Sequence, residues 1–280
     1  MRKSNLKLLS LGIFIILMQN SLVAADKNGN THLGIFNSTK GKDNYIVGTF
    51  NKTEGNKNNI AGATNKTEGD KNNITGASNK TKGDENKILG SFNNTTGNNN
   101  AIGGASQTTT GNNNTIGGAS NKTVGNSNNV LGTLQDTEGD NNTIAGISQV
   151  TKGSNNTVGG ASQTTTGNNN VIGGATNKTI GDKNNIVGIS NKTEGTSNKI
   201  LGNTNSITGD SNNIKGISNT LVGNKNAVLG LNNSIEGNRN GVLGFDNKTK
   251  GDLNLIAGLK NETTGDKNLV LGAKNKTTGD

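Results

Sequence analysis

The stretch GNKNNIAGATNKTE, from Gly55 to Glu68, is one copy of a unit that the chain repeats without insertion or deletion. A glycine occurs at every seventh position from Gly34 to Gly279, which accounts for 36 of the 43 glycines. The two seven-residue halves differ, so the true repeat is twice the glycine spacing. Such a long unbroken period indicates stacked units, because a unit packed between neighbours cannot change length independently.

Each half of the unit follows the pattern G-x-x-N-x-(I/V/T)-x. The Asn and the aliphatic or Thr residue are two positions apart, which places them on one face of a strand. A helix would need recurrence at three and four positions, and each helical Gly would cost about 1 kcal/mol relative to Ala. The pattern therefore predicts an all-β protein, a parallel β-roll (β-solenoid) with two short strands in each 14-residue coil.

Two columns of the repeat form the predicted interior. An aliphatic column is expected to form the core and consists of Ile46, Ile60, Ile74, Ile88, Ile102, Ile116, Val130, Ile144, Val158, Ile172, Ile186, Ile200, Ile214, Val228, Val242, Ile256 and Val270. An Asn column is expected to form a hydrogen-bonded ladder and includes Asn44, Asn58, Asn72, Asn86, Asn100, Asn114, Asn128 and Asn142. Stacked Asn side chains can bond to one another and to the turn backbone.

The composition alone would indicate disorder, since 27% of the residues are hydrophobic and 2% are aromatic. The fixed glycine spacing argues against disorder. Cys is absent, so no disulfide framework is available. The segment up to Ala25 holds three of the 28 Lys and Arg and none of the 19 Asp and Glu, so the rest of the chain has a net charge of +6. This charge is spread along the chain without a basic block, so we expect no nucleic-acid partner.

The N-terminal segment that ends at Ala25 differs from the repeat. Arg2, Lys3 and Lys7 precede an apolar run from Leu8 to Met18, and small residues follow at 23–25. This order is typical of a secretory signal peptide. We therefore predict a signal peptide at residues 1–25, an N-terminal lead-in or cap at 26–33, and the β-roll at 34–280, in an exported protein.

The residues that flank alternate glycines differ in polarity. Those next to the glycine after each Ile or Val are mostly apolar, whereas those next to the other glycine are charged or amide-bearing. A continuous exposed apolar stripe favours burial between chains, and closed symmetry would bury it best. The pattern therefore predicts several rolls packed around one axis, with a subunit interface that contains Val47, Leu89, Leu131, Val187, Leu201, Leu229, Leu243 and Leu271.

The phrases NNNTIGGASNKTVG (Asn112–Gly125) and NNNVIGGATNKTIG (Asn168–Gly181) resemble the head domains of trimeric autotransporter adhesins of the YadA and UspA type. The resemblance covers residues 34–280 and implies a left-handed parallel β-roll, trimeric, on a bacterial outer membrane. It implies adhesion to host matrix proteins of the collagen, fibronectin or laminin type, or to a receptor of the CEACAM type. A stalk and a membrane anchor would follow residue 280, because the chain stops within a coil; without such an anchor the protein would be secreted.

A second family shares the seven-residue pattern x-x-N-x-V-x-G. Grass ice-recrystallisation inhibitors are also β-rolls, and they would need a flat outward array of regularly spaced Thr, Ser or Val. The chain offers outward Thr patches at Thr108 and Thr110 and at Thr164 and Thr166. Ice binding is therefore the alternative function, and a structural surface spacer is a further one.

Aromatic residues are scarce and lie toward the N-terminal end. Because aromatic residues are enriched in binding hot spots, Phe36, Tyr45, Phe50 and Phe92 are candidate receptor-binding residues, the alternative being that they cap the first coils. No catalytic constellation can be assembled, since Cys is absent and His32 is the only His. His32 is interpreted as a variant of the aliphatic column. We expect no enzyme activity, no cofactor and no metal.

Overall fold

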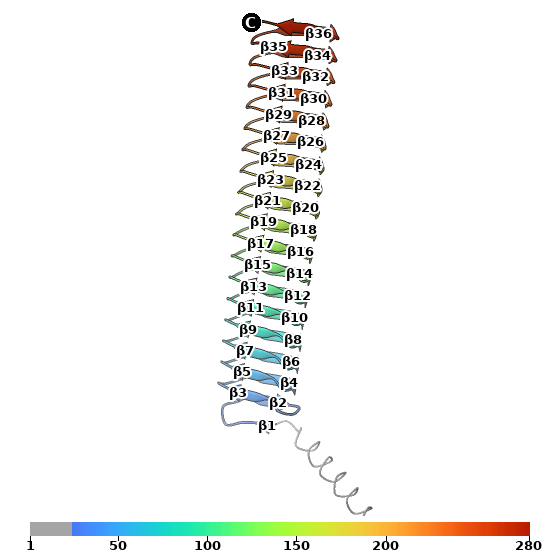
Figure 1. The fold of residues 1–280 in the computed structure, drawn as a ribbon. Helices are drawn as coiled ribbons and strands as arrows, with labels where there is room; N and C mark the ends of the chain where they lie inside the picture. Colours follow the sequence, from blue (N-terminus) through green and yellow to red (C-terminus); the bar gives the residue numbers. More distant parts are fainter. Residues whose placement is uncertain (1–23) are drawn as a thin grey trace, which may run out of the picture. The chain divides into compact units, whose positions relative to one another are not determined.

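The computed structural model describes residues 24–280, so residues 1–23 of the predicted signal peptide lie outside the described part. The described chain divides into two compact units, unit 1 up to Ser127 and unit 2 from Asn128 to Asp280. In both units five-residue strands alternate with three-residue strands, and one strand of each kind makes up one 14-residue coil. The predicted all-β parallel β-solenoid is confirmed (Figure 1).

Unit 1 begins with two short strands, β1 (Ala24–Ala25) and β2 (Thr31–Leu33), which pair in antiparallel fashion. Its five-residue strands are β4 (Tyr45–Thr49), β6 (Asn59–Ala63), β8 (Asn73–Ala77), β10 (Lys87–Ser91), β12 (Ala101–Ala105) and β14 (Thr115–Ala119). Its three-residue strands are β3 (Ser38–Lys40), β5 (Lys52–Glu54), β7 (Lys66–Glu68), β9 (Lys80–Lys82), β11 (Asn94–Thr96), β13 (Thr108–Thr110) and β15 (Lys122–Val124).

Unit 2 has the same alternation. Its five-residue strands are β16 (Asn129–Thr133), β18 (Thr143–Ile147), β20 (Thr157–Ala161), β22 (Val171–Ala175), β24 (Asn185–Ile189), β26 (Lys199–Asn203), β28 (Asn213–Ile217), β30 (Ala227–Leu231), β32 (Gly241–Phe245), β34 (Leu255–Leu259) and β36 (Leu269–Ala273). Its three-residue strands are β17 (Asp136–Glu138), β19 (Val150–Lys152), β21 (Thr164–Thr166), β23 (Lys178–Ile180), β25 (Lys192–Glu194), β27 (Ser206–Thr208), β29 (Thr220–Val222), β31 (Ser234–Glu236), β33 (Lys248–Lys250), β35 (Glu262–Thr264) and β37 (Lys276–Thr278).

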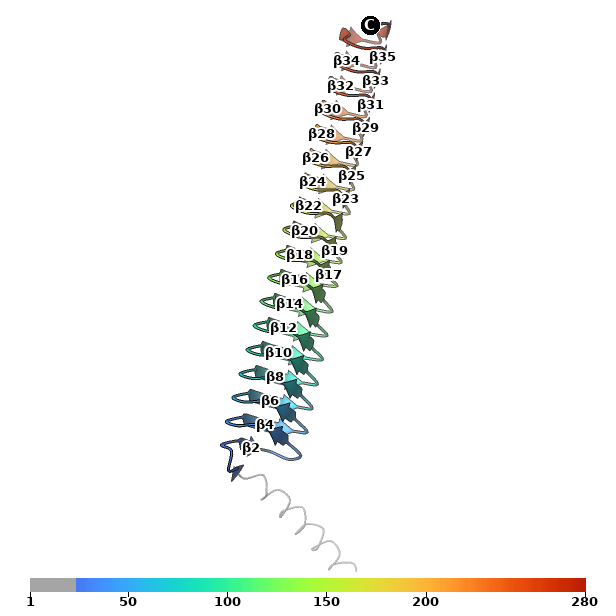
Figure 2. The same cartoon turned by 90° about the vertical axis from the view of Figure 1, so that its left-hand side faces the viewer.

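Within each unit the even-numbered strands form one parallel sheet, sheet A, and the odd-numbered strands from β3 onward form a second, sheet B. Each strand pairs in register with the equivalent strand of the next coil, as β20 does with β22 through Val158 and Ile172. Figure 2 shows the strands of each sheet one above another. The register brings every column of the repeat into a line of side chains spaced at about 4.8 Å, the distance between neighbouring strands.

The aliphatic column points inward from sheet A. All 17 of its Ile and Val residues are at most 4% exposed. Sheet B supplies the opposite wall, where the inward residue is Thr in most coils and Ile207, Leu221 and Ile235 in three successive coils. Burial of each Ile side chain contributes about 1.5–3 kcal/mol to stability. Summed over the stacked coils, this stabilises a fold that a single coil could not maintain. His32 pairs with Ile46 and thus occupies the aliphatic column.

The Asn side chains form two ladders, one from the residues that directly precede the strands of sheet A and one from those that directly precede the strands of sheet B. Asn58 illustrates the bonding: its backbone N–H and its Nδ2 both donate to Oδ1 of Asn44, at 2.9 and 3.0 Å, and Nδ2 also donates to the carbonyl of Gly69 at 2.8 Å. The second ladder runs through Asn51 and Asn65 in the same way. Each buried amide thus forms hydrogen bonds with the Asn of the preceding coil and with a glycine carbonyl at a bend. These bonds hold the backbone in place at both turns of the coil.

The glycines at every seventh position adopt φ values between 107° and 151°, a region that residues with a Cβ rarely enter. Gly188 has φ of 148°, and a Cβ built on it would overlap the backbone carbonyl of Gly202 in the next coil. The glycine spacing is therefore required both by backbone conformation and by the close approach of stacked coils. No helix among residues 24–280 is long and apolar enough to cross a membrane.

Candidate functional site

The outward side chains of sheet A form a face that we call face A. Three positions of each five-residue strand point outward, for example Thr157, Gly159 and Ala161 of β20. From β4 to β36 the charged residues on this face are Lys87 in unit 1 and Lys199 and Lys215 in unit 2. In each unit face A is therefore a nearly uncharged surface built on a regular backbone lattice.

Part of face A has very low relief. In unit 1 this part comprises Ala101 and Gly103 of β12 and Thr115 and Gly117 of β14. In unit 2 the low-relief strip comprises Thr143, Ala145, Thr157, Gly159, Val171 and Gly173. A Cβ built on Gly103 or Gly173 would have no atom within 4 Å, so the fold itself does not require glycine there. The small side chains keep these parts of the face flat.

The outward side chains of sheet B form the opposite surface, face B, which is charged. Lys66 and Glu68 lie 2.8 Å apart on β7, and Lys152 lies 3.6 Å from Glu138. The hydrogen bond between Lys66 and Glu68 lowers the pKa of the Glu68 carboxyl and raises the pKa of the Lys66 ammonium. Such exposed pairs contribute little to stability, because water and salt screen the two charges. They keep this side of the protein strongly hydrated.

The uncharged Thr patches that the sequence suggested lie on face B. Thr108 and Thr110 are the first and last residues of β13, and Thr164 and Thr166 are those of β21. In each strand the middle Thr is buried. Lys and Glu residues lie on nearby coils of the same face. Another uncharged stretch occurs on β27 and β29, whose outward residues are Ser206, Thr208, Thr220 and Val222. Sequence patterning missed it because Ile207 and Leu221 interrupt the inward Thr column.

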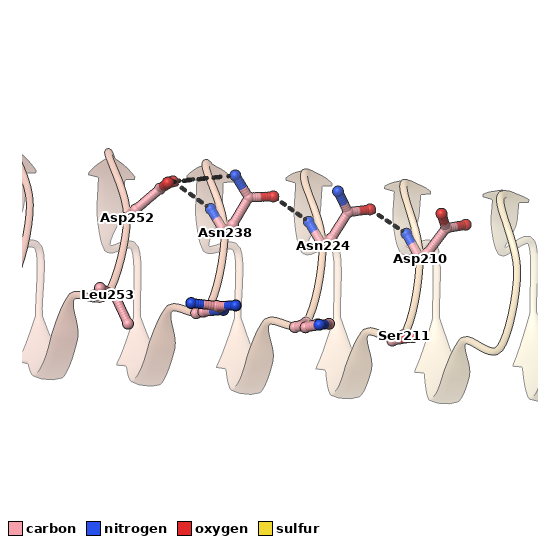
Figure 3. A pocket seen from close by; sticks show the side chains of 8 residues that line it. Asp210, Ser211, Asn224, Asn238, Asp252 and Leu253 are labelled. Atoms are coloured by element: carbon pink, nitrogen blue, oxygen red, sulfur yellow. Dashed lines mark hydrogen bonds between the residues drawn. The ribbon is translucent and has the colours of Figure 1, made fainter.

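The turn between sheet B and sheet A carries an outer ladder of Asp and Asn side chains, shown for four coils in Figure 3. The backbone N–H of Asp210 donates to Oδ1 of Asn224 at 2.7 Å, and that of Asn238 donates to Oδ1 of Asp252 at 2.7 Å. Arg239 lies beside this ladder. The carboxylates are thus hydrogen-bonded to the turns, and no group of three or more His, Cys, Asp or Glu in residues 24–280 could hold a metal ion.

The four aromatic candidates do not form one site. Phe36 and Phe50 stack with ring centroids 4.9 Å apart, and both occupy bend positions with positive φ. Phe92 occupies the same bend position three coils beyond Phe50, whereas Tyr45 points outward from sheet A. A residue other than glycine in the left-handed region costs about 1–2 kcal/mol, and Ser is the commonest residue at this bend in the other coils. The Phe side chains therefore lie on a turn and Tyr45 on a different surface.

The residues predicted to form a subunit interface all lie on face A, in the middle outward column of the five-residue strands. Leu89, Leu131 and Leu271 are each more than 60% exposed. The apolar and the polar residues that flank alternate glycines therefore lie on two faces and their adjoining turns. The sequence pattern alone does not show that the strands of sheet A extend through their glycine. The trimer and the left-handed sense of the roll stay predictions.

Comparison with known families relates part of the chain to an antifreeze protein. The family model of the grass antifreeze beta roll matches residues 180–272, which are 93 of the 280 residues and lie in unit 2. No curated protein matches the chain. The match is a similarity over about a third of the chain, and it concerns a segment that contains both ladders and the aliphatic column.

The prediction of a trimeric autotransporter adhesin of the YadA or UspA type is wrong, because the matching family is an antifreeze roll. The error has a physical origin. The inward columns satisfy the same turns and the same core in both kinds of roll, so they cannot separate the two. The separation depended on the outward apolar residues, which had been interpreted as an interface between subunits. The adhesive function is wrong for the same reason, and the binding role of the four aromatic residues stays a prediction.

Proposed function

We propose that the chain binds ice through face A and thereby inhibits ice recrystallisation. The observation that carries the proposal is the contrast between the two faces, one regular and nearly uncharged and the other covered with Lys and Glu. The match of residues 180–272 to the grass antifreeze beta roll supports an ice-binding function for the roll, and the low-relief strip of unit 2 directly precedes the matched residues. In this function the chain is exported, as its N-terminal sequence indicates, and acts outside the cell.

The physical requirement is a rigid surface that holds water in a regular arrangement. Parallel strands in register repeat every ~4.8 Å, so the Thr hydroxyls and small apolar groups of face A recur at fixed intervals. A Lys ammonium is strongly hydrated and disturbs such an arrangement. The low-relief strip of unit 2 meets these requirements best, because Thr143 and Thr157 lie side by side on adjacent strands, next to a column of the small residues Ala145 and Gly159.

Rigidity comes from the interior. Val158 lies beneath the strip and is 1% exposed, and Asn156 and Asn170 hold the neighbouring coils together through their amides. A face fixed in this way loses little conformational entropy when it meets a crystal surface. The strip therefore pairs low charge with a backbone that is already ordered.

The test is an ice-recrystallisation assay on the exported chain with two matched Thr variants. Thr157→Lys places an ammonium on the low-relief strip, whereas Thr166→Lys places one on face B, and both Thr residues are exposed. We expect the wild-type chain and Thr166→Lys to slow the growth of ice grains, and Thr157→Lys to lose most of that activity. A wild-type chain that performs no better than an inert protein of equal size would refute ice binding.

A further inference from the structure

Face A changes character toward the C-terminal end of unit 2. Past Lys199 and Lys215 its outward side chains become large and apolar, with no charge from β30 to β36. The members of this C-terminal patch are between 39 and 65% exposed and comprise Ile217, Leu229, Leu231, Leu243, Phe245, Leu255, Leu259, Leu269 and Leu271. Patches of this size on an otherwise polar protein mark interaction surfaces.

The patch is uneven, unlike the low-relief strip. A recess of about 500 Å³ is lined by the large residues Leu229, Leu243 and Leu255 and by the small residues Ala227, Gly241 and Ala257, and its lining on β28 includes Asn213 and Lys215. The Leu255 side chain leans over Gly241, since a Cβ built on that glycine would lie 2.9 Å from Leu255 Cδ1. Knobs and hollows thus alternate between adjacent coils, which suits a protein surface better than a flat crystal plane.

We infer that this patch binds the same patch of a second copy of the chain, in an antiparallel dimer whose twofold axis runs along β32, in place of the trimer that the sequence predicted. In that arrangement the same outward column of the two copies meets, and the coils run in opposite directions, so that β30 of one copy faces β34 of the other. Leu229 of one copy then faces Ala257 of the other, and Leu255 faces Ala227. A large side chain meets a small one at each of these contacts, which is the self-complementarity that a twofold contact requires.

The outer column and the ends of the patch follow from the same axis, and at the two ends Lys215 faces Leu271 and Asn213 faces Leu269. Phe245 faces its own counterpart, and Leu231 faces Leu259, so the outer column also pairs apolar with apolar groups. Lys215 lies two coils from the axis, which separates it from its symmetry mate by about 19 Å along the stack. A parallel pairing centred on the middle column would instead place the two Lys215 side chains directly opposite each other, where like charges are destabilising.

The area is sufficient for a specific contact. Nine Leu, Ile and Phe side chains that are roughly half exposed offer on the order of 700 Å² per copy, against about 800 Å² per partner in a standard interface. Sheets that pack face to face lie about 10 Å apart, which leaves room for one layer of interlocking Leu side chains. The occupant that matches this patch in shape and lack of charge is therefore a second copy.

The first test measures the mass of the full exported chain by sedimentation equilibrium at up to about 100 µM, in ice-free buffer. We expect a reversible dimer for the wild-type chain. Leu243→Lys, at the axis, should weaken dimerisation at least tenfold, and the matched control Leu131→Lys should leave it unchanged. Leu131 occupies the same outward column on β16, outside the patch. A monomer throughout, a trimer, or equal loss in both variants would overturn the inference.

The second test determines the orientation and uses the absence of Cys from the chain. Lys215 on β28 and Leu271 on β36 face each other across the axis, so a bis-maleimide that spans about 10 Å should join a chain carrying Lys215→Cys to one carrying Leu271→Cys. It should not join two chains that both carry Lys215→Cys, because these positions lie four coils apart across the axis. The reverse result would overturn the antiparallel arrangement. Both tests are independent of ice binding, which can fail while the dimer holds.

Discussion

Removal of a single buried amide should destabilise the coil stack more than any exposed change does. Asn184 Nδ2 donates to Oδ1 of Asn170 at 3.1 Å and to the carbonyl of Gly195 at 2.8 Å. Its own Oδ1 accepts from the backbone N–H and from Nδ2 of Asn198, at 3.0 and 3.1 Å. Asn184→Ala deletes all four bonds and leaves buried partners without their counterpart.

The expected cost follows from these bonds. At about 1 kcal/mol for each net hydrogen bond, the four together amount to about 4 kcal/mol, and buried donors left unsatisfied increase the loss. Asn184→Asp should be milder at low pH than at neutral pH, because it keeps the acceptor for Asn198 but turns a carboxylate toward the Gly195 carbonyl. Protonation of that carboxylate removes the repulsion and restores one donor.

Native-state hydrogen exchange measures the effect locally, through the opening free energy of the amides in the neighbouring coils. Asn185→Ala is the matched control, because Asn185 is adjacent in sequence but exposed on face A. We expect a change within about 0.5 kcal/mol for the control. A cost below about 1 kcal/mol for Asn184→Ala, or equal effects of the two variants, would show that the ladder does not hold the coils together.

Three further outcomes are expected. Thr179→Val should stabilise the chain by about 1 kcal/mol in thermal unfolding, because the Thr179 Oγ1 is buried without a hydrogen-bond partner and an isosteric apolar group removes that cost; a loss of stability would contradict this. Gly188→Ala should prevent a stable fold, as judged by far-ultraviolet circular dichroism, because its Cβ would overlap the Gly202 carbonyl; native-like spectra would show that the coils can separate to admit it. The Asn30 side chain, followed by its backbone N–H, lowers the pKa of Asp26. The stabilisation of the N-terminal turn is therefore complete above the unfolded pKa of about 3.9 and is lost as the pH falls through the lower folded pKa, which the Asn30 amide proton shift should report and Asp26→Asn should abolish.

The fold could be predicted from the sequence because each inward column obeys a strict rule. A fixed Gly spacing, an invariant Asn and an aliphatic residue two positions later specify a turn, a ladder and a core in every coil. The outward residues obey no such rule. Val47 and Leu243 occupy equivalent positions, and pattern alone could not tell whether that position belongs to a face, to an edge or to a contact between chains.

The strand register of the structure shows that this outward position belongs to a face. In the structure sheet A extends through its glycine to a third outward column, so the flanking apolar residues lie on one broad face. The function prediction was wrong for the same reason, because the sequence alone does not show whether the outward apolar column forms a flat face or a subunit interface. The small residue Gly173 drew no attention in the sequence, although the absence of any nearby atom shows that the fold leaves room for a larger one.

Partition of the chain between a growing ice crystal and the remaining solution tests the central proposal most directly. Fluorescently labelled wild-type chain should become enriched in slowly grown ice, together with Thr166→Lys, whereas Thr157→Lys should remain in the liquid. Circular dichroism of the three proteins should be the same, since both substitutions lie at exposed positions. Exclusion of the wild-type chain from ice would contradict the account, and so would equal incorporation of all three proteins.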